Sequence, residues 1–419
     1  MTSPNCVAFD PQRALAAHRH EFGEHGGVNM SVEVSTTFTV MAPGTMPEIF
    51  AGQRGPEAGG CYLYGRHFNP TVHALASELA AMEGTEAAYC TASGMSAIVG
   101  ALLQLCHQGS SIVAGHGIYG GTFALLAEFL PKRCGIETTF VDTCDLEAVD
   151  AALATGAKVL YVETLANPTL RVADIPALAE CAHRHGAKLV VDNTFCPLVV
   201  SPARLGADVV VHSLTKFING SSDAIGGVIC GSREFVGSLM DLHDGALMLM
   251  GPTMDPRVAS QMSLRLPHLG LRMTEHCRRA QIFAQRLHEL GLPVIHPALP
   301  HHPQHALLRR LANDGIGLCG LLALELPDAD IAARLMDELQ NAQRFGYIAV
   351  SLGYHDTLMS CSAASTSSEL DPQSLQRAGI SAGLLRLSIG YTGTLEDRWA
   401  QLLAGLRAVG LLDATTTGC

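Results

Sequence analysis

The alternation of short apolar runs with helical stretches is the feature that most constrains the fold. Runs rich in β-branched residues occur at 111–114, 158–163, 188–193 and 208–214, and stretches rich in Ala, Leu and Glu separate them. Consecutive parallel strands need long crossover connections, which are usually helices. The run at 188–193 is almost wholly apolar until Asp192, as expected for a strand covered on both faces. The pattern therefore predicts an α/β fold with a mainly parallel sheet flanked by helices.

A chain of 419 residues is long enough for two or three domains. Residues 1–65 have little periodicity and many small or polar residues, which predicts an N-terminal arm that needs a partner surface. Helical spacing begins at about residue 72. We expect a large domain at 66–264 and a smaller α+β domain at 265–419. In the latter the pattern predicts a helix at 271–290, a strand at 318–325, a helix at 329–341 and a strand that ends at Arg386.

Charge and composition disfavour several partners and locations. The formal net charge is −12, which disfavours nucleic acid or an anionic membrane as a general partner. No apolar run reaches the ~18 residues that a membrane helix needs, and the first residues lack the apolar segment of a signal peptide. The 13 cysteines are scattered and odd in number, which is typical of thiols in a reducing compartment. We therefore expect a cytoplasmic protein.

A cluster of histidines raises the question of a metal site. The cluster consists of His296, His301, His302 and His305. Prolines interleave these residues, so the segment is expected to be an extended loop without a helical face to hold ligands. Neither a CxxC pair nor an HExxH motif accompanies it. We expect solvated loop histidines and no metal.

Lys216 lies just beyond the run at 208–214, where the carboxyl ends of strands place ligand-binding residues in open α/β sheets. Burial at such a position lowers the pKa of a lysine toward that of a nucleophilic amine. Lysines of this kind form Schiff bases with carbonyl compounds and with pyridoxal phosphate (PLP). A surface lysine past a strand end would have the same sequence.

Asp192 closes the neighbouring apolar run. A carboxylate there is costly to bury without a partner. It either caps a turn with Asn193 and Thr194 or pairs with a cationic group such as a protonated pyridine nitrogen.

Two earlier segments suit a phosphate and an aromatic ring. Ser93 and Gly94 precede an apolar helical stretch, so the helix N-terminus could bind a phosphate, although ordinary capping by Ser93 explains the same residues. Tyr119 precedes two glycines and could lie on an aromatic cofactor, or simply pack within a loop.

Taken in order, these segments resemble the Cys/Met metabolism family of PLP-dependent enzymes, whose members include cystathionine γ-synthase and methionine γ-lyase. The resemblance covers about residues 62–411. It rests on the motifs YGRHFNPT at 64–71, ASGM at 92–95, YGGT at 119–122, ETLANPT at 163–169, VDNT at 191–194, HSLTK at 212–216 and RLSIG at 386–390. It implies the aspartate-aminotransferase-like fold type I.

The resemblance also implies a role for each matching residue. Lys216 would form the Schiff base with PLP and move protons, and Tyr119 would stack on the ring and assist. Asp192 would pair with the pyridine nitrogen, and Asn167 would bond the phenolic oxygen. Arg386, with Ser351 nearby, would bind the substrate α-carboxylate. The remaining cofactor-binding residues would hold the phosphate: Gly94, Met95, Ser213 and Thr215, with Tyr64 and Arg66 from a neighbouring subunit. The family thereby implies a homo-oligomer, a tetramer built from dimers that share active sites.

The expected reaction is γ-elimination on a γ-substituted, sulfur-type amino acid, and the alternative is γ-replacement by a transferase of the cystathionine γ-synthase or O-acetylhomoserine sulfhydrylase type. Family members that act on cystathionine usually carry Glu where Val350 stands, so an apolar residue is closer to the methionine γ-lyases. Those enzymes, however, carry Cys where Gly121 stands. The family histidine is missing from residues 362–367. The residues Tyr354, His355 and Asp356 are also unusual for the family. Either they contact a polar γ-substituent of the substrate, or they lie in a loop whose sequence has drifted without an effect on function.

Overall fold

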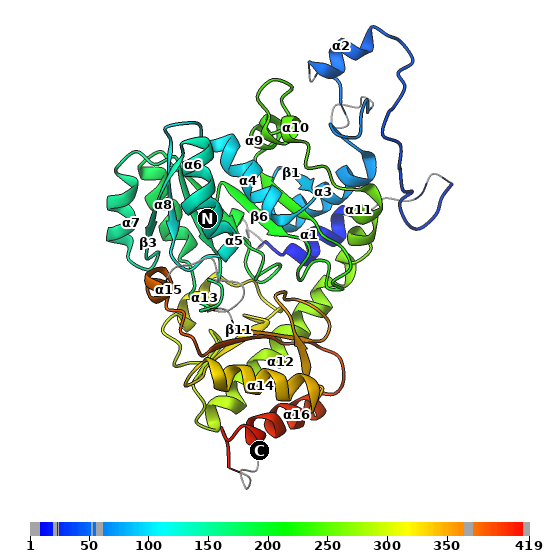
Figure 1. The fold of residues 1–419 in the computed structure, drawn as a ribbon. Helices are drawn as coiled ribbons and strands as arrows, with labels where there is room; N and C mark the ends of the chain where they lie inside the picture. The colour runs from blue at the N-terminus through cyan, green and yellow to red at the C-terminus, as the bar shows by residue number, and fades with distance from the viewer. Residues whose placement is uncertain are drawn as a thin grey trace, which may run out of the picture.

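The computed structural model describes residues 9–19, 23, 25–51, 53–55, 62–361, 363 and 372–413 (Figure 1). Two sheets organise the chain. The strands are β1 (Ala87–Thr91), β2 (Ser111–Gly115), β3 (Glu137–Val141), β4 (Val159–Glu163), β5 (Lys188–Asp192), β6 (Val209–Ser213), β7 (Gly227–Gly231), β8 (Val294–Ile295), β9 (Leu321–Glu325), β10 (Gly346–Ile348), β11 (Thr357–Cys361) and β12 (Leu384–Ser388).

The first sheet has seven strands in the order β1-β7-β6-β5-β4-β2-β3. Strands β2 to β6 are parallel to one another, and β7 runs antiparallel to both of its neighbours, β6 and β1. The four strands that the apolar runs predict are present with bounds that differ by at most one residue at either end. The predicted α/β class with a mainly parallel sheet is confirmed.

Helices cover both faces of this sheet, as Figure 1 shows. Because strand side chains alternate, each face forms a core of its own. The helices of the first part are α1 (Pro11–His18), α2 (Thr45–Phe50), α3 (Pro70–Glu83), α4 (Gly94–Leu105), α5 (Gly120–Ala124), α6 (Leu130–Cys134), α7 (Leu146–Leu153), α8 (Ile175–Arg184), α9 (Arg233–Ser238), α10 (Ala246–Met250) and α11 (Pro256–Ser263). One core lies against α3, α7 and α8, and the other against α4, α9 and α10.

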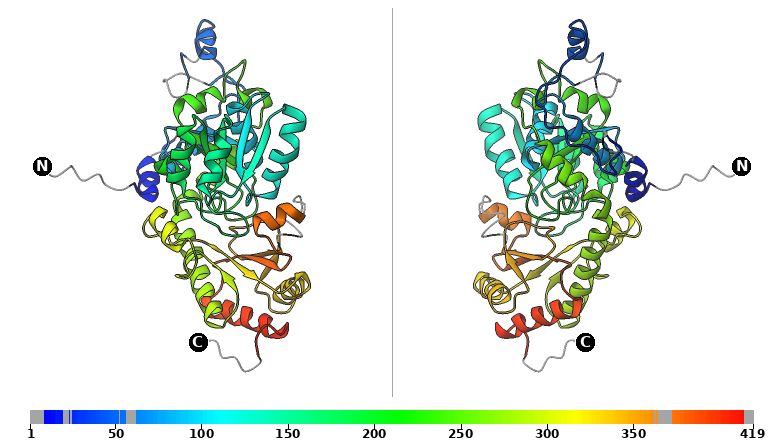
Figure 2. Two further views of the ribbon diagram at one scale, coloured as in Figure 1. Left: turned by 90° about the vertical axis from the view of Figure 1, so that its left-hand side faces the viewer. Right: turned by 90° about the vertical axis from the view of Figure 1, so that its right-hand side faces the viewer.

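The second sheet has five strands in the order β10-β11-β12-β9-β8. Its helices are α12 (Leu269–Glu289), α13 (His305–Leu311), α14 (Ala329–Asn341), α15 (Pro372–Ala378) and α16 (Leu395–Ala408). Side chains of this sheet share a hydrophobic core with those of α12, α14 and α16. Figure 2 shows the second sheet and its helices below the seven-stranded sheet. The expected strand does not end at Arg386, because β12 continues to Ser388 and places Arg386 in its middle.

The N-terminal segment is not extended throughout. Helix α1 packs against α3, where Leu15 is buried and Arg19 pairs with Glu78 at 3.3 Å. The segment that holds α2 projects from the body of the chain (Figures 1 and 2). Its contact with a neighbouring subunit, like the division at residues 65 and 264, stays a prediction.

The expectation of solvated histidines is wrong for His296. Its side chain is buried, Nδ1 accepts the Ala298 N–H at 3.1 Å, and Nε2 lies 3.2 Å from the Cys319 carbonyl. Burial lowers the pKa of His296 to about 4. The ring is thus a neutral group that secures the turn after β8.

No helix in the described part of the chain combines the length and the apolar character that crossing a membrane requires.

Candidate active site

A cavity of about 230 Å³ opens where β4, β5 and β6 end. Open α/β sheets place their ligand sites at this edge because the carboxyl ends of parallel strands meet there. Nine of the predicted site residues line the cavity: Gly94, Met95, Tyr119, Asn167, Asp192, Ser213, Thr215, Lys216 and Arg386. The structure therefore brings together side chains that are up to 292 residues apart in the sequence (Gly94 to Arg386).

Lys216 projects into this cavity from the turn after β6. Its Nζ donates a 3.1 Å hydrogen bond to Ser351 Oγ, which comes from the segment after β10. Burial, assisted by the positive charge of Arg386, lowers the pKa of Lys216 to about 8. About a tenth of the amine is therefore unprotonated at pH 7, and nucleophilic attack on a carbonyl requires this form.

Asp192 ends β5 with its carboxylate held from two sides. Oδ1 accepts the Thr194 N–H at 2.9 Å, and the Tyr161 hydroxyl donates to Oδ2 at 3.3 Å. Burial raises the pKa of Asp192, and the hydrogen bonds from Thr194 act in the opposite direction. A cation at the carboxylate would offset this desolvation cost. The turn with Thr194 that the sequence allows is thus present, and the same carboxylate faces the cavity.

The start of α4 lies against the end of β6. Ser93 caps the helix through a reciprocal pair of hydrogen bonds with Ser96, so the predicted capping is also present. A Cβ atom at Gly94 would lie 2.7 Å from Ser213 Cβ, which leaves room only for glycine. The first N–H groups of a helix have no intrahelical partner, and Gly94 and Met95, the first two residues of α4, line the cavity together with Ser213. This arrangement forms a concave site for an anion.

Thr215 contributes less directly than its place in the motif suggests. Its hydroxyl donates to the Gly226 carbonyl at 3.3 Å and accepts the Gly226 N–H at 3.2 Å. The side chain thus holds the loop before β7 against the site.

Arg386 is buried in the middle of β12 and reaches across to the larger sheet. One terminal nitrogen donates to Asn167 Oδ1 at 2.9 Å, and the other donates to the Ser351 carbonyl at 3.0 Å. Its Nε has no hydrogen-bond partner among the described residues. Burial lowers the pKa of Arg386 to about 10, so the guanidinium is still charged at neutral pH. A buried cation with an unused donor suits a small carboxylate.

Sequence reasoning missed the role of Glu163, which it noted only as part of a motif. Glu163 ends β4 beside Asp192 on β5 and lines the cavity. Its two oxygens accept the N–H groups of Tyr119, at 2.7 Å, and Asn167, at 3.2 Å. A carboxylate that closes a buried strand is the signal that identified Asp192, and it could have identified Glu163 as well.

A polar network underlies the same strand ends on the opposite face of the sheet. His212 Nε2 lies 2.8 Å from Glu83 Oε1, and both side chains are about 1% exposed. Asn193 donates to the same Glu83 oxygen at 3.4 Å and accepts from the Thr164 hydroxyl at 2.8 Å. Each of Thr164, Asn193 and His212 is adjacent in sequence to a cavity residue, so the network fixes the strand ends from behind.

Tyr64 and Arg66 do not join this cavity within one chain. Tyr64 is about half exposed, and Arg66 lies 5.8 Å from its ring while donating to the Met248 carbonyl at 2.6 Å. Their predicted contribution to a neighbouring site stays a prediction.

Tyr354, His355 and Asp356 also lie outside the described lining of the cavity. Asp356 accepts from the Thr392 hydroxyl and from Arg398, the latter at 3.2 Å. The structure thus favours a structural role for Asp356. The segment at 362–367, where the family histidine is missing, lies outside the described residues except for Ala363.

The donor set fits PLP. The start of α4 approaches Ser213 so closely that only glycine fits at position 94, and the buried carboxylate of Asp192 forms no salt bridge with any lysine or arginine among the described residues. Because Asn167 Oδ1 accepts from Arg386, its amide nitrogen is left to donate to an oxygen in the cavity. Lys216, whose amine has a lowered pKa, lines the same cavity and would attach the cofactor.

Comparison with known proteins gives one family. The family model described as Cys/Met metabolism PLP-dependent enzyme matches residues 13–407. Methionine gamma-lyase of Arabidopsis thaliana is 57% identical over 393 residues, which are 94% of this chain and 89% of the relative. O-succinylhomoserine sulfhydrylase of Pseudomonas aeruginosa is 35% identical over 408 residues, 96% of each chain.

A solved chain from Campylobacter jejuni subsp. jejuni has the same architecture. It superimposes with a TM-score of 0.86 at 26% identity, covering 95% of this chain and 100% of its own, and it carries N'-pyridoxyl-lysine-5'-monophosphate. The chain belongs to the Cys/Met metabolism family of PLP-dependent enzymes.

Proposed function

We propose that this protein is a γ-elimination lyase whose substrate is L-methionine or a close thioether analogue. The overall reaction converts L-methionine and water into 2-oxobutanoate, ammonia and methanethiol. The Cγ–S bond breaks, the sulfur takes a proton, and water replaces the nitrogen at Cα.

The apolar open end of the cavity is the observation that carries this proposal. Val350 and Ile225 line it while being 66% and 65% exposed, so they stand at its mouth, and Leu352 lies beside them. Of the described lining residues, only Glu163 and Asp192 carry carboxylates, and both belong to the strand ends. Such a mouth suits an apolar methylthio group better than the charged amino-acid head of cystathionine. The methionine gamma-lyase relative at 57% identity supports the same choice.

PLP, when bound, supplies an electron sink for the negative charge that develops on the substrate carbons. Lys216 would hold the cofactor and move protons at Cα and Cβ, for which its lowered pKa near 8 suits it. Asp192 would keep the pyridine nitrogen protonated, and Asn167 would donate to the phenolic oxygen. Arg386 would bind the substrate carboxylate, and Tyr119 would cover the ring and assist proton transfer. Gly94, Met95, Ser213 and Thr215 would position the phosphate, the last of them through the loop it supports.

A substrate panel tests the proposal against γ-replacement, which the sulfhydrylase relative makes the second candidate. Purified PLP-loaded protein is incubated with L-methionine, L-homocysteine or O-succinyl-L-homoserine, each with and without a small thiol. We expect 2-oxobutanoate and ammonia from methionine without added thiol. Product that forms only from the homoserine ester and only with thiol would reject the lyase in favour of the transferase.

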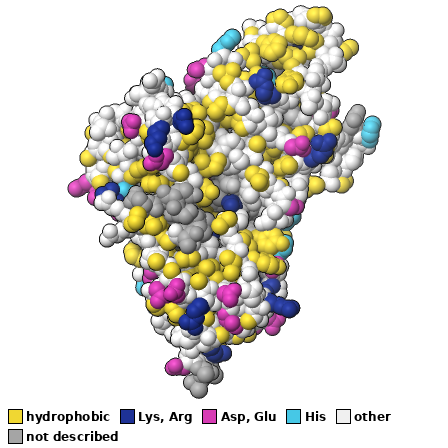
Figure 3. All heavy atoms as spheres, in the orientation of Figure 1, with side chains coloured by type: hydrophobic (Ala, Val, Ile, Leu, Met, Phe, Trp, Pro, Cys, Tyr) yellow, Lys and Arg dark blue, Asp and Glu magenta, His cyan; other side chains and the backbone are white. Residues whose placement is uncertain are grey.

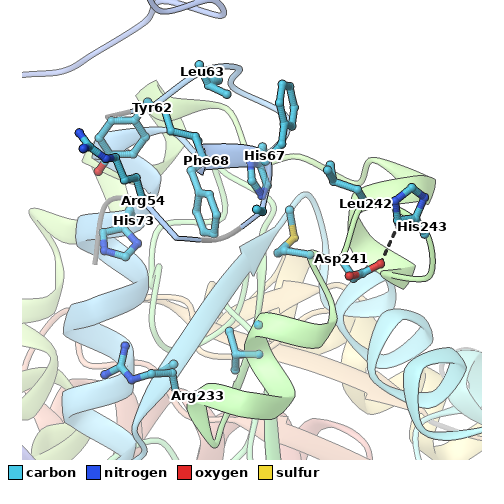
Figure 4. Close-up of a pocket in the computed structure, with 18 of the residues that line it drawn as sticks. Arg54, Tyr62, Leu63, His67, Phe68, His73, Arg233, Asp241, Leu242 and His243 are labelled. Atoms are coloured by element: carbon cyan, nitrogen blue, oxygen red, sulfur yellow. Dashed lines mark hydrogen bonds between the residues drawn. The ribbon is translucent and has the colours of Figure 1, made fainter. Parts of the chain in front are cut away.

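We also propose that the protein is a homo-oligomer, a tetramer built from two dimers in which Tyr64 and Arg66 reach the partner's cavity. Figure 3 shows hydrophobic side chains gathered over the projecting α2 segment, where Met46 and Phe50 are exposed. Beneath that segment lies a pocket of about 550 Å³. Figure 4 shows Arg54 and Tyr62 on one side of it and Leu242 and His243 on the other. An exposed apolar segment beside an open pocket is typical of a surface that another subunit covers.

A cytoplasmic location is proposed on the state of the cysteines. All ten cysteines in the described part of the chain are free, and most are buried. Such thiols suit a reducing compartment.

A further inference from the structure

We infer that Glu163 is a positioning residue that sets the places of Tyr119 and Asn167 through one carboxylate. The inference rests on the proposed function, because it concerns the residues that would cover and bond the PLP ring. Nothing in the geometry requires Glu163 to touch the reacting atoms, so its action would be indirect.

The first step is the position of Glu163 at the end of β4. It is paired in register with Asp192 on β5, so the two carboxylates lie side by side on the cavity face of the sheet. The side chain of Glu163 is buried, with 9% of its surface exposed. Burial and the charge of Asp192 raise the pKa of Glu163, whereas the two N–H bonds from Tyr119 and Asn167 lower it. A glutamate at this place is therefore costly, and an apolar residue would close the strand more cheaply.

The second step is what the carboxylate holds. Oε1 accepts the backbone N–H of Tyr119, which immediately precedes α5, and Oε2 accepts the backbone N–H of Asn167 in the turn after β4. The two donors are 48 residues apart in the sequence (Tyr119 to Asn167), and no strand pairing joins them. One side chain thus joins the loop that carries the ring-covering tyrosine to the turn that carries the amide.

The third step is how the two backbone contacts of Glu163 reach the site side chains. Tyr119 is 40% exposed, so the surrounding protein covers only part of it. A Cβ atom at Gly121 would lie 2.6 Å from Tyr119 Cε1, which shows that the ring folds back over its own loop. The position of Asn167 also affects Arg386, because the Asn167 side chain accepts a hydrogen bond from Arg386 at 2.9 Å. Fixing two backbone N–H groups therefore orients the ring cover, the amide and the carboxylate-binding guanidinium together.

Glu163→Gln is the matched test, since it keeps the volume of the side chain but leaves one acceptor oxygen for two N–H donors. Glu163→Asp keeps both oxygens but withdraws them by one methylene. Glu325→Gln is the control: Glu325 also ends a strand, β9, and accepts from the Ser381 hydroxyl, but it does not line the cavity.

Two readouts separate positioning from general stability. In the apo protein, amide hydrogen exchange at Tyr119 and Asn167 reports the two bonds directly. In the loaded enzyme, we expect Glu163→Gln to lower kcat for methionine about ten- to hundredfold, the usual effect of losing a hydrogen bond to a charged group. KM should rise by a smaller factor, because Arg386 keeps its charge.

We expect faster exchange at one of the two amides in Glu163→Gln, faster exchange at both in Glu163→Asp, and neither change in Glu325→Gln. Unchanged exchange and unchanged kcat in folded Glu163→Gln or Glu163→Asp protein would overturn the inference. If Glu163→Gln does not fold, Glu163→Asp decides by the same measures. A wild-type protein that leaves methionine intact would reject the proposed function, while the exchange result on the apo protein would still test the role of Glu163.

Discussion

Lys216 Nζ donates to Ser351 Oγ at 3.1 Å, and this contact links the turn after β6 to the segment that follows β10 in the second sheet. The reactive amine is thus positioned by both sheets. Since Arg386 on β12 also bonds the Ser351 carbonyl, at 3.0 Å, the amine and the guanidinium share one support.

Replacing Lys216 by Ala should abolish covalent PLP binding and elimination. The loss of a positioned acid–base group alone lowers a rate by about 10²–10⁴-fold. Absorbance spectra and borohydride reduction followed by mass spectrometry measure the attachment. Lys188→Ala is the control, because Lys188 is exposed at the start of β5 and pairs with Asp208 at 2.8 Å. Equal PLP attachment in the Lys216→Ala and wild-type proteins would contradict the assignment.

The pKa of Lys216 predicts how PLP capture depends on pH. Because the unprotonated amine attacks the aldehyde, the rate of PLP capture by apo protein should rise through a midpoint near pH 8 and level off above it. The same shift predicts a gain in stability with pH. Between about pH 8 and the ordinary lysine pKa of 10.5, the unfolded chain holds a proton that the folded chain lacks, so unfolding becomes harder as pH rises. Stopped-flow absorbance and thermal melts of the apo protein measure the two effects. A capture rate that is flat from pH 7 to 9 would argue against the lowered pKa.

Substituting Gly94 by Ala should weaken PLP binding. The new Cβ would meet Ser213 Cβ at 2.7 Å and push the α4 N-terminus away from the end of β6. Overpacking of this kind costs roughly 1–3 kcal/mol of folding free energy. Gly237→Ala is the control, since a Cβ on that helical glycine meets no atom within 4 Å. Equilibrium titration of apo protein with PLP measures the affinity, and chemical denaturation measures the free energy of unfolding. Equal PLP affinity in Gly94→Ala and Gly237→Ala would contradict a role for the close Gly94–Ser213 contact in PLP binding.

The cofactor side of the site was predictable from sequence because burial leaves a simple signal there. Strand β5 is apolar until Asp192, and β6 ends at Ser213, three residues before Lys216. Polar residues directly after apolar strands indicate the carboxyl edge of a parallel sheet, where ligands bind. Arg386 was recognised only through the family motif, since a charged residue in the middle of β12 gives no periodic signal of its own. Glu163 closes an apolar strand as Asp192 does, so its place at this edge was predictable, but its partners are backbone N–H groups, which the sequence does not indicate. The burial of His296 depends on the distant Cys319 carbonyl, a contact that the neighbouring prolines do not indicate.

Changing Arg386 to Lys should raise KM for methionine more than it lowers kcat. Lysine lacks the planar fork that contacts Asn167 and Ser351, and losing a hydrogen bond to a charged group costs about 10- to 100-fold in binding. Arg279→Lys is the control, because Arg279 is similarly buried and bonds the Thr392 and Gly393 carbonyls but does not line the cavity. Steady-state kinetics on the two variants distinguish the cases. A larger rise in KM for Arg279→Lys would show that general stability, and not carboxylate binding, governs the effect.

Shared active sites predict that two inactive variants restore each other. In a mixed dimer of Lys216→Ala and Arg66→Ala subunits, one cavity combines Lys216 of the second subunit with Arg66 of the first and is intact, whereas the other carries both defects. Random re-association of equal amounts should therefore recover roughly a quarter of the wild-type sites, as two-fold symmetry dictates. The measurement is 2-oxobutanoate formation after the mixture is unfolded and refolded together, compared with each variant refolded alone. Arg66 within its own chain bonds the Met248 carbonyl, at 2.6 Å, and does not line its own cavity. No recovery on mixing, with dimers confirmed by native mass spectrometry, would mean that each cavity is complete within one chain and that the Arg66 defect acts locally.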